Sequence, residues 1–351
     1  MTSSRTQILS LSFNQDYQCL AIGTTNGFRI FNVNPFAETF RREFNPPGGI
    51  GCVEMLYRCN IIALVGGGHN PRYPPNKVLI WDDHQTRSIG ELSFRSEIRG
   101  VRLRKDRIVV VLDAKIYVYN FADLKLLDHI ETGTNPEGLC CVSPLPSATI
   151  VVCPGLQRGH ARVEHYHIKT QPTTLIAAHE SELSAMAINN NGSLLATASR
   201  KGTLIRVWDT TRGTLQHEVR RGSDRACITS LAFNPDSTYL VASSDKGTVH
   251  IFSLIPNQNS SPQPGTKSSF SGLLPAYFSS SWSHSRFRVT ADSVSIVAFD
   301  NEPNTIVVVC MNGLAYKAKF DPKKPGDCTE AMCIDFMRTD VTISDFNETP
   351  N

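Results

Sequence analysis

Residues 190–209 read NNGSLLATASRKGTLIRVWD, and residues 234–253 read NPDSTYLVASSDKGTVHIFS. The two stretches align almost without gaps, with Asn190 opposite Asn234, and Gly202 and Gly247 lie 45 positions apart. A spacing of about 40–45 residues is the period of a WD-type propeller blade. Each stretch has an apolar run, a Lys-Gly turn and an alternating run, which predicts two antiparallel strands joined by a tight loop.

The same pattern recurs along the whole chain of 351 residues. Gly27 lies 175 positions before Gly202, about four repeat lengths, and three more units fit between them. The five further units are residues 13–32, 53–82, 98–120, 138–168 and 296–320. The dipeptides Trp81-Asp82 and Trp208-Asp209 end predicted strands, as they do in WD repeats. Seven units predict an all-β, WD40-like seven-bladed β-propeller, a single closed domain over residues 1–351, although the length alone also allows two domains.

One insertion interrupts the repeat. Gly247 and Gly313 lie 66 positions apart, about 20 more than one period, and the surplus coincides with the Ser-, Pro- and Gln-rich residues 256–281. Apolar side chains on such a loop either tuck against the propeller or enter a bilayer. We interpret residues 256–281 as a membrane-facing loop with five candidate anchors, Phe270, Leu273, Leu274, Tyr277 and Phe278. Residues 328–351 form the closing segment and a C-terminal tail, for which both order and disorder stay open.

Composition and charge exclude several classes of function. A net charge of +3, from 35 Lys plus Arg and 32 Asp plus Glu, excludes a uniformly basic nucleic-acid coat. The first residues, MTSSRTQ, do not resemble a secretory signal, so we read the ten cysteines as reduced thiols of a cytoplasmic protein. No apolar run approaches the roughly 20 residues of a spanning helix. A soluble protein, at most peripheral on a membrane, is expected.

Motifs for catalysis or for a metal do not occur. The chain has no CxxC, GxSxG or HExxH motif and no P-loop, so we expect no enzyme activity, metal or cofactor. Gly66-Gly67-Gly68 is followed by a proline-rich stretch and not by the helix that a phosphate loop requires. His160, His165 and His167 are close in sequence, but no carboxylate partner is evident, and we expect them at the surface.

Positive charge concentrates in residues 200–225. Seven basic residues against three acidic ones give this segment +4, more than the whole chain. Within it, Arg220 and Arg221 are adjacent and precede Gly222. Successive side chains of an extended strand point to opposite faces, so the two arginines serve two sites, one toward each neighbouring blade. Arginine with hydroxyl and imidazole groups suits phosphate monoesters. The alternative is that these charges only protect a strand edge from aggregation.

These motifs resemble those of the PROPPIN family, the phosphoinositide-binding propellers of autophagy that include the WIPI proteins. The most specific element is Val219-Arg220-Arg221-Gly222 between ATASRKGTLIRVWD and SSDKGTVHIF, where Val219 replaces the Leu or Phe that is usual in the family. FNQD, NGFRIFN and YPPNKVLIWDD are similar to the WIPI branch closest to lipid-transfer partners.

The resemblance implies two rim sites for phosphatidylinositol 3-phosphate and phosphatidylinositol 3,5-bisphosphate. Carried over by motif, site 1 comprises His179, Ser199, Lys201, Gly202, Thr203, Arg206 and Arg220. Site 2 comprises Arg221, Ser244, Thr248 and His250. Residues 256–281 correspond to the family's membrane-inserting loop.

The resemblance also implies partners and a location. Asn14 and Asp16 match positions that, in this branch, contact the rod-shaped autophagy lipid-transfer protein of the Atg family. A cytoplasmic monomer is expected, recruited to phosphoinositide-containing preautophagosomal (phagophore) and endosomal or lysosomal/vacuolar membranes, where it would recruit lipid-transfer machinery during autophagosome formation. The alternative is a generic WD-repeat scaffold that binds proteins without lipid specificity.

Overall fold

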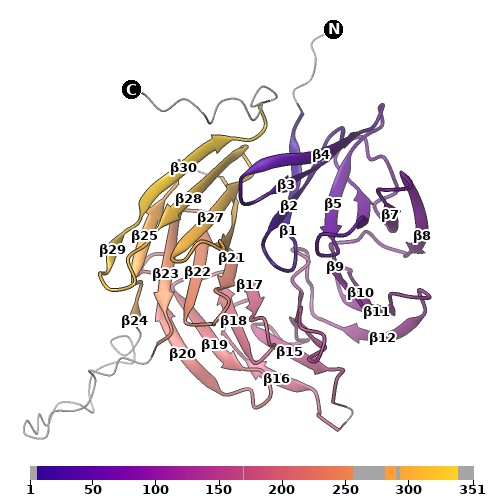
Figure 1. Cartoon of the computed structure of the whole chain (residues 1–351). Helices are drawn as coiled ribbons and strands as arrows, with labels where there is room; N and C mark the ends of the chain where they lie inside the picture. The colour runs from indigo at the N-terminus through magenta and orange to yellow at the C-terminus, as the bar shows by residue number, and fades with distance from the viewer. Residues whose placement is uncertain (1–5, 169, 256–280, 290–292, 339–351) are drawn as a thin grey trace, which may run out of the picture.

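Seven sheets stand around a central axis as the blades of a propeller, and their first four strands are antiparallel (Figure 1). The computed structural model describes residues 6–168, 170–255, 281–289 and 293–338, and these ranges contain no helix. The prediction of an all-β, seven-bladed propeller is confirmed. Each predicted strand pair forms the middle of a blade, and an inner and an outer strand complete it.

Blades 1 to 4 each consist of four strands that follow one another in the chain. Blade 1 contains β1 (Ile8–Phe13), β2 (Cys19–Thr24), β3 (Gly27–Asn32) and β4 (Ala37–Glu43). Blade 2 contains β5 (Ile50–Met55), β6 (Ile61–Gly66), β7 (Lys77–Asp82) and β8 (Arg87–Ser93). Blade 3 contains β9 (Gly100–Arg104), β10 (Arg107–Val111), β11 (Lys115–Asn120) and β12 (Leu126–Glu131). Blade 4 contains β13 (Cys141–Val142), β14 (Ile150–Pro154), β15 (His160–His165) and β16 (Thr174–Ala177).

Blades 5 and 6 each gain a fifth strand at the outer edge. Blade 5 contains β17 (Leu183–Ile188), β18 (Leu194–Ser199), β19 (Leu204–Asp209), β20 (Leu215–Arg220) and β24 (Ser281–Trp282). Blade 6 contains β21 (Ile228–Phe233), β22 (Tyr239–Ser244), β23 (Thr248–Ser253), β25 (Ser285–Arg288) and β29 (Gly326–Asp327). Blade 7 contains β26 (Ser295–Phe299), β27 (Thr305–Cys310), β28 (Leu314–Lys319) and β30 (Thr329–Asp335).

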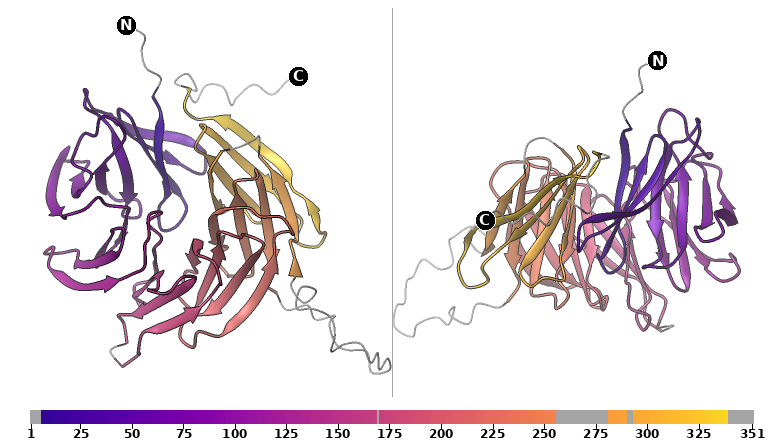
Figure 2. Two further views of the ribbon diagram at one scale, coloured as in Figure 1. Left: turned by 180° about the vertical axis from the view of Figure 1, so that it is seen from behind. Right: turned by 45° about the horizontal axis from the view of Figure 1, so that its top comes forward.

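The core lies between the blades. The second strands β2, β22 and β27 are buried at every position, whereas the outer strand β12 is mostly exposed. Both faces of a second strand pack on neighbouring sheets, so its sequence is a continuous apolar run. Blade 1 packs on blade 7 through a cluster that includes Leu20, Ile22, Val307 and Val309, and this contact closes the ring (Figure 2).

An asparagine turn that recurs between the first and second strands corrects the repeat register. The Asn189 Oδ1 accepts the Leu194 N–H at 2.9 Å, and the Asn234 Oδ1 accepts the Tyr239 N–H at 2.8 Å. Asn189, and not Asn190, is therefore the counterpart of Asn234. The spacing is then 45 residues at this turn as well as at Gly202 and Gly247, and the alignment needs no gap.

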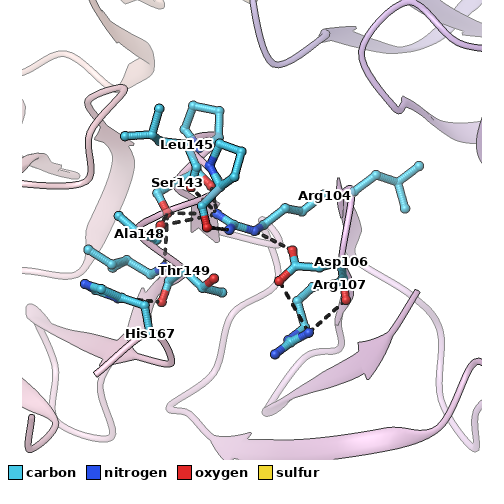
Figure 3. A network of polar contacts seen from close by, with 12 residues as sticks. Arg104, Asp106, Arg107, Ser143, Leu145, Ala148, Thr149 and His167 are labelled. Atoms are coloured by element: carbon cyan, nitrogen blue, oxygen red, sulfur yellow. Dashed lines mark hydrogen bonds and ion pairs between the residues drawn. The ribbon is translucent and has the colours of Figure 1, made fainter. Parts of the chain in front are cut away.

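Blades 3 and 4 are joined by the buried Arg104 at the end of β9. Its guanidinium donates to the carbonyl oxygens of Ser143, Leu145 and Ala148 at 2.7, 2.8 and 3.2 Å, and to that of Pro146 at 2.9 Å (Figure 3). Charge-assisted hydrogen bonds of this kind are stronger than neutral ones. One side chain thus satisfies the carbonyl groups of a turn that has little regular structure.

The predicted insertion falls between the third and fourth strands of blade 6: β23 ends at Ser253, and β24 begins at Ser281, before β25. The candidate anchors Phe270, Leu273, Leu274, Tyr277 and Phe278 lie outside the described residues, as do residues 339–351 of the tail. The closing segment is described as far as residue 338, and its strand β30 pairs with β28. Within the described ranges, no helix is long and apolar enough to cross a membrane.

Candidate functional site

The two arginines of the motif lie on opposite faces of blade 5. Val219, at the end of β20, belongs to the apolar cluster between blades 5 and 6. Because side chains alternate along a strand, Arg220 faces blade 4 and Arg221 faces blade 6. Arg221 indeed lies close enough to His250 of blade 6 to lower the pKa of that imidazole. The geometry has the divergence that the adjacent arginines predict.

Site 1 lies on the face of blade 5 that meets blade 4. Arg206 on β19 donates to the Ala178 carbonyl of the blade 4 to blade 5 connection at 2.6 Å and to the Glu218 carboxylate at 2.9 Å. Ser199 and Thr203 are buried, and Lys201 is exposed in the turn between them. Hydroxyl, ammonium and guanidinium groups therefore occur together in residues 199–206, and Arg220 pairs with Leu204 of this segment.

His179 is held within this site by a polar network that also has a structural role. Its Nε2 lies 3.0 Å from the Thr197 hydroxyl, which in turn accepts the Trp208 indole N–H at 2.9 Å. Thr197 is fully buried, so this network anchors the connection from blade 4 to the centre of blade 5. Loss of His179 would therefore affect packing as well as any ligand contact.

The turn at Gly202 connects the two sites. Gly202 has a φ of +62°, and a Cβ there would lie 1.6 Å from the Ala226 carbonyl oxygen. Its own carbonyl oxygen accepts the Arg221 Nε at 2.8 Å, and the Thr203 carbonyl accepts the Arg221 N–H at 3.0 Å. The turn of site 1 thus positions the arginine of site 2, and only glycine fits this backbone.

Site 2 lies between blades 5 and 6. Phe252 of β23 packs in the cluster that blade 6 shares with blade 5, so His250 and Thr248, two and four residues before it, share its face. Ser244 ends β22 on the same side, since Leu240 and Ala242 belong to that cluster. His250 is 6% exposed, and its Nδ1 has no hydrogen-bond partner among the described residues. A buried, unpaired imidazole nitrogen favours a ligand oxygen at this position.

Two arginines near site 2 were not identified from the sequence. Arg286 and Arg288 on β25 pair with His250 and Thr248 of β23, so they lie at the outer side of site 2. Arg286 lowers the pKa of His250 and forms an ion pair with Asp327 at 3.5 Å. These residues follow the insertion, where the repeat period is lost, and only strand pairing could have revealed their position.

The burial of the arginines distinguishes the two interpretations of their charge, anion binding and protection of a strand edge. A residue that only protects a strand edge is solvated, but Arg220 is 5% exposed. Burial also lowers the pKa of Arg221, which Asp245 and Asp224 partly offset. Arg221 is partly exposed, as is Arg206. This burial of the arginines suits the binding of an anion better than protection of a strand edge.

The two histidines are neutral in the folded protein near pH 7. Burial and the neighbouring Arg206 lower the pKa of His179 to about 4. Burial, Arg221 and Arg286 likewise lower the pKa of His250 to about 4. A neutral imidazole can donate from one ring nitrogen and accept at the other, so the arginines, and not the histidines, carry the positive charge here.

These pKa values predict a pH-dependent stability. An unfolded histidine titrates near pH 6.5, so between pH 6.5 and 4 the unfolded chain binds more protons and the free energy of unfolding falls as the pH falls. The loss is about 2 kcal/mol for each imidazole. Urea unfolding at pH 7 and pH 4.5 measures it. We expect the free energy of unfolding of H179N/H250N to depend less on pH than that of the native protein. H84N, which replaces an exposed histidine, should keep the native dependence. Equal dependence in all three proteins would contradict the assignment.

The glycine run and the histidines considered in the sequence have roles outside the two sites. A Cβ on Gly66 would lie 1.7 Å from the Tyr73 carbonyl oxygen, so the glycine run permits close backbone packing. The expectation of a surface position is wrong for His165, which is buried with its Nε2 3.1 Å from the Thr210 carbonyl oxygen. The sequence signal for its burial is the alternation of β15, where Ala161 and Val163 are buried too. No group of His, Cys, Asp or Glu in the described part of the chain has the arrangement of a metal site.

The proposed partner residues differ in exposure. Asn14 is 2% exposed, and its side-chain amide donates to the Tyr57 carbonyl at 3.1 Å and accepts the Cys19 N–H at 3.0 Å. It occupies the recurring asparagine turn, which explains its presence. Asp16 is exposed. Of the two residues, Asp16 is the one accessible to a partner.

The sequence and the fold of this chain are similar to those of known proteins. The PROPPIN family model matches residues 7–290. Autophagy-related protein 18e of Arabidopsis thaliana is 38% identical over 326 residues, 92% of this chain and 86% of that protein. Autophagy-related protein 18 of Dictyostelium discoideum is 34% identical and aligned over 91% of each chain. The crystal structure of Hsv2 from Kluyveromyces marxianus superposes with a TM-score of 0.77 at 25% identity and covers 95% of this chain and 100% of that one.

Proposed function

The chain belongs to the PROPPIN family, and on this premise we propose that it is a phosphoinositide effector of autophagy. It binds phosphatidylinositol 3-phosphate and phosphatidylinositol 3,5-bisphosphate at two sites, one between blades 4 and 5 and the other between blades 5 and 6. The observation that carries the proposal is the placement of Arg220 and Arg221 on opposite faces of one blade. Arg221 lies near His250, and on the other face Arg206 lies near His179.

Each site has the groups that a phosphate monoester requires. In site 1, Lys201 and Arg206 meet the phosphate, and Arg220 supports it from the floor of the site. In site 2, Arg221 meets it, with Ser244, Thr248 and the free Nδ1 of His250 as further hydrogen-bonding groups. Arginine forks and hydroxyl groups recognise phosphate oxygens through charge-assisted hydrogen bonds.

Two weak sites on one rigid blade give firm attachment. Each basic residue near an anionic membrane contributes on the order of 1 kcal/mol. Once the first headgroup is bound, the second site meets lipid at a high effective concentration, which raises the avidity without new contacts. Residues 256–281, with their five apolar candidates, are proposed as a second means of membrane attachment.

Attachment at the rim leaves the rest of the propeller for partners. We propose that the turn with Asp16 contributes to binding of the rod-shaped autophagy lipid-transfer protein at phagophore, endosomal or lysosomal/vacuolar membranes. The protein then acts as a monomeric, non-enzymatic adaptor, recruited from the cytoplasm. It couples the lipid composition of a membrane to the arrival of lipid-transfer machinery.

Vesicle flotation tests this function. Vesicles with 3-phosphorylated phosphatidylinositol are compared with vesicles of equal net charge that contain phosphatidylserine and unphosphorylated phosphatidylinositol. We expect strong attachment to the first and about tenfold weaker attachment to the second, because a site-bound phosphate contributes beyond general charge. Equal attachment to both would support the alternative, a WD-repeat protein scaffold without lipid specificity.

A further inference from the structure

A short strand places an aromatic side chain at the rim beside site 1. β24 follows the insertion in blade 6, yet it lies beside β20 of blade 5 (Figure 1) and pairs with it in parallel. In this pairing Arg220 is opposite Trp282. It forms the outer edge of that blade. Opposite residues in a sheet share a face, so Trp282 lies on the same face as Arg220. Its backbone stands one strand spacing, about 4.8 Å, farther from the propeller axis.

Trp282 is unusually exposed for a tryptophan. The chain has three, and Trp282 is 60% exposed, whereas Trp81 is 8% and Trp208 is 9% exposed. Exposing so large an apolar surface is unfavourable in water unless another surface covers it. Tryptophan is enriched at membrane–water interfaces, since its ring is apolar and its N–H bonds to headgroups.

The position of Trp282 relative to the proposed phosphate site indicates what covers its ring. In the proposed function, a phosphoinositide at site 1 would have its phosphate next to Arg220, and its glycerol and acyl chains would extend outward past the rim. The next strand outward from Arg220 carries Trp282. An aromatic ring at this place meets the boundary between headgroups and acyl chains.

We propose that Trp282 is an interfacial membrane anchor at the outer edge of site 1. The proposal rests on the proposed phosphoinositide function and adds a contact with the bilayer itself, made by a residue that strand pairing holds in place. The occupant is the lipid surface. Trp282 needs no contact with the headgroup phosphate.

Tryptophan fluorescence of the native protein tests the proposal. On vesicles of phosphatidylcholine with 5% phosphatidylinositol 3-phosphate, the emission of Trp282 should shift to shorter wavelength, and bromine on the upper acyl chain should quench it. The buried Trp81 and Trp208 lie inside the blades. In W282F the shift and the quenching should vanish while attachment is largely kept, because phenylalanine retains an apolar ring.

A serine variant measures the contribution to attachment. W282S should bind these vesicles about tenfold more weakly, from loss of apolar burial, and should bind the soluble headgroup inositol 1,3-bisphosphate as the native protein does. I89S is the matched control, since Ile89 is 46% exposed on the outer strand of blade 2, on the far side of the ring; its attachment should be unchanged.

The outcomes distinguish the Trp282 anchor from the proposed phosphoinositide function. Phosphoinositide-dependent attachment with no spectral shift, no quenching and native binding by W282S would overturn the anchor and leave the proposed function intact. Absence of phosphoinositide-dependent attachment in the native protein would overturn the proposed function and the anchor with it. A shift, quenching and the loss in W282S would support both.

Discussion

Replacing Arg220 and Arg221 together by threonine is expected to weaken attachment to phosphatidylinositol 3-phosphate vesicles by at least about a hundredfold. The double variant removes one guanidinium from each site, so both headgroup contacts are lost at once. R220T and R221T should each give an intermediate loss, because one site remains and only the avidity of the pair disappears. Vesicle flotation over a range of lipid concentrations measures all three.

The control removes the same charge from the opposite rim. Arg87 and Arg95 are exposed on or next to the outer strand of blade 2, and R87T/R95T should attach almost as the native protein does. Circular dichroism should show native strand content in every variant. Equal losses in R87T/R95T and R220T/R221T would show that net charge alone drives attachment.

The largest expected loss of stability follows from Gly202→Ala. Its φ of +62° disfavours a side chain, and the new Cβ would lie 1.6 Å from the Ala226 carbonyl oxygen. Relief of this clash must move the backbone, so we expect a loss of about 3 kcal/mol in the free energy of unfolding. Both sites should weaken as well, since the Gly202 carbonyl holds the Arg221 guanidinium. Urea unfolding and vesicle flotation measure the two effects.

Gly222 offers a matched control within the arginine motif. A Cβ there meets no atom within 4 Å, so Gly222→Ala should change the free energy of unfolding by less than about 0.5 kcal/mol. If Gly202→Ala proved as stable as Gly222→Ala, the turn would not have the strained geometry that links the two sites.

The repeat was enough to predict the fold, because every blade contains a buried strand pair, and in every blade except blade 3 a glycine lies in or directly after the connection between its two strands. The outer strands were harder to foresee. β12 is mostly exposed and has no clean alternation, and β24 has only two residues and pairs with a strand 62 positions earlier in the chain. Such pairings depend on the closed ring and leave no local pattern.

The candidate sites were partly predictable. Adjacent arginines on a strand must diverge, and this rule alone led to two sites. Arg286 and Arg288 were missed because the insertion hides their repeat register. The role of Asn14 was also hidden, since the same turn recurs at Asn189 and Asn234 and its function there is to bind backbone groups. A motif shows which residue is present, and only packing shows how much of it a ligand can reach.

The central claim is that blade 5 separates two independent phosphate sites. Isothermal titration of the protein with inositol 1,3-bisphosphate, in solution and without membrane, tests it most directly. We predict two headgroups per native protein, one for R220T, one for R221T and none for the double variant. A single headgroup per native protein, or loss of all binding in either single variant, would contradict the claim.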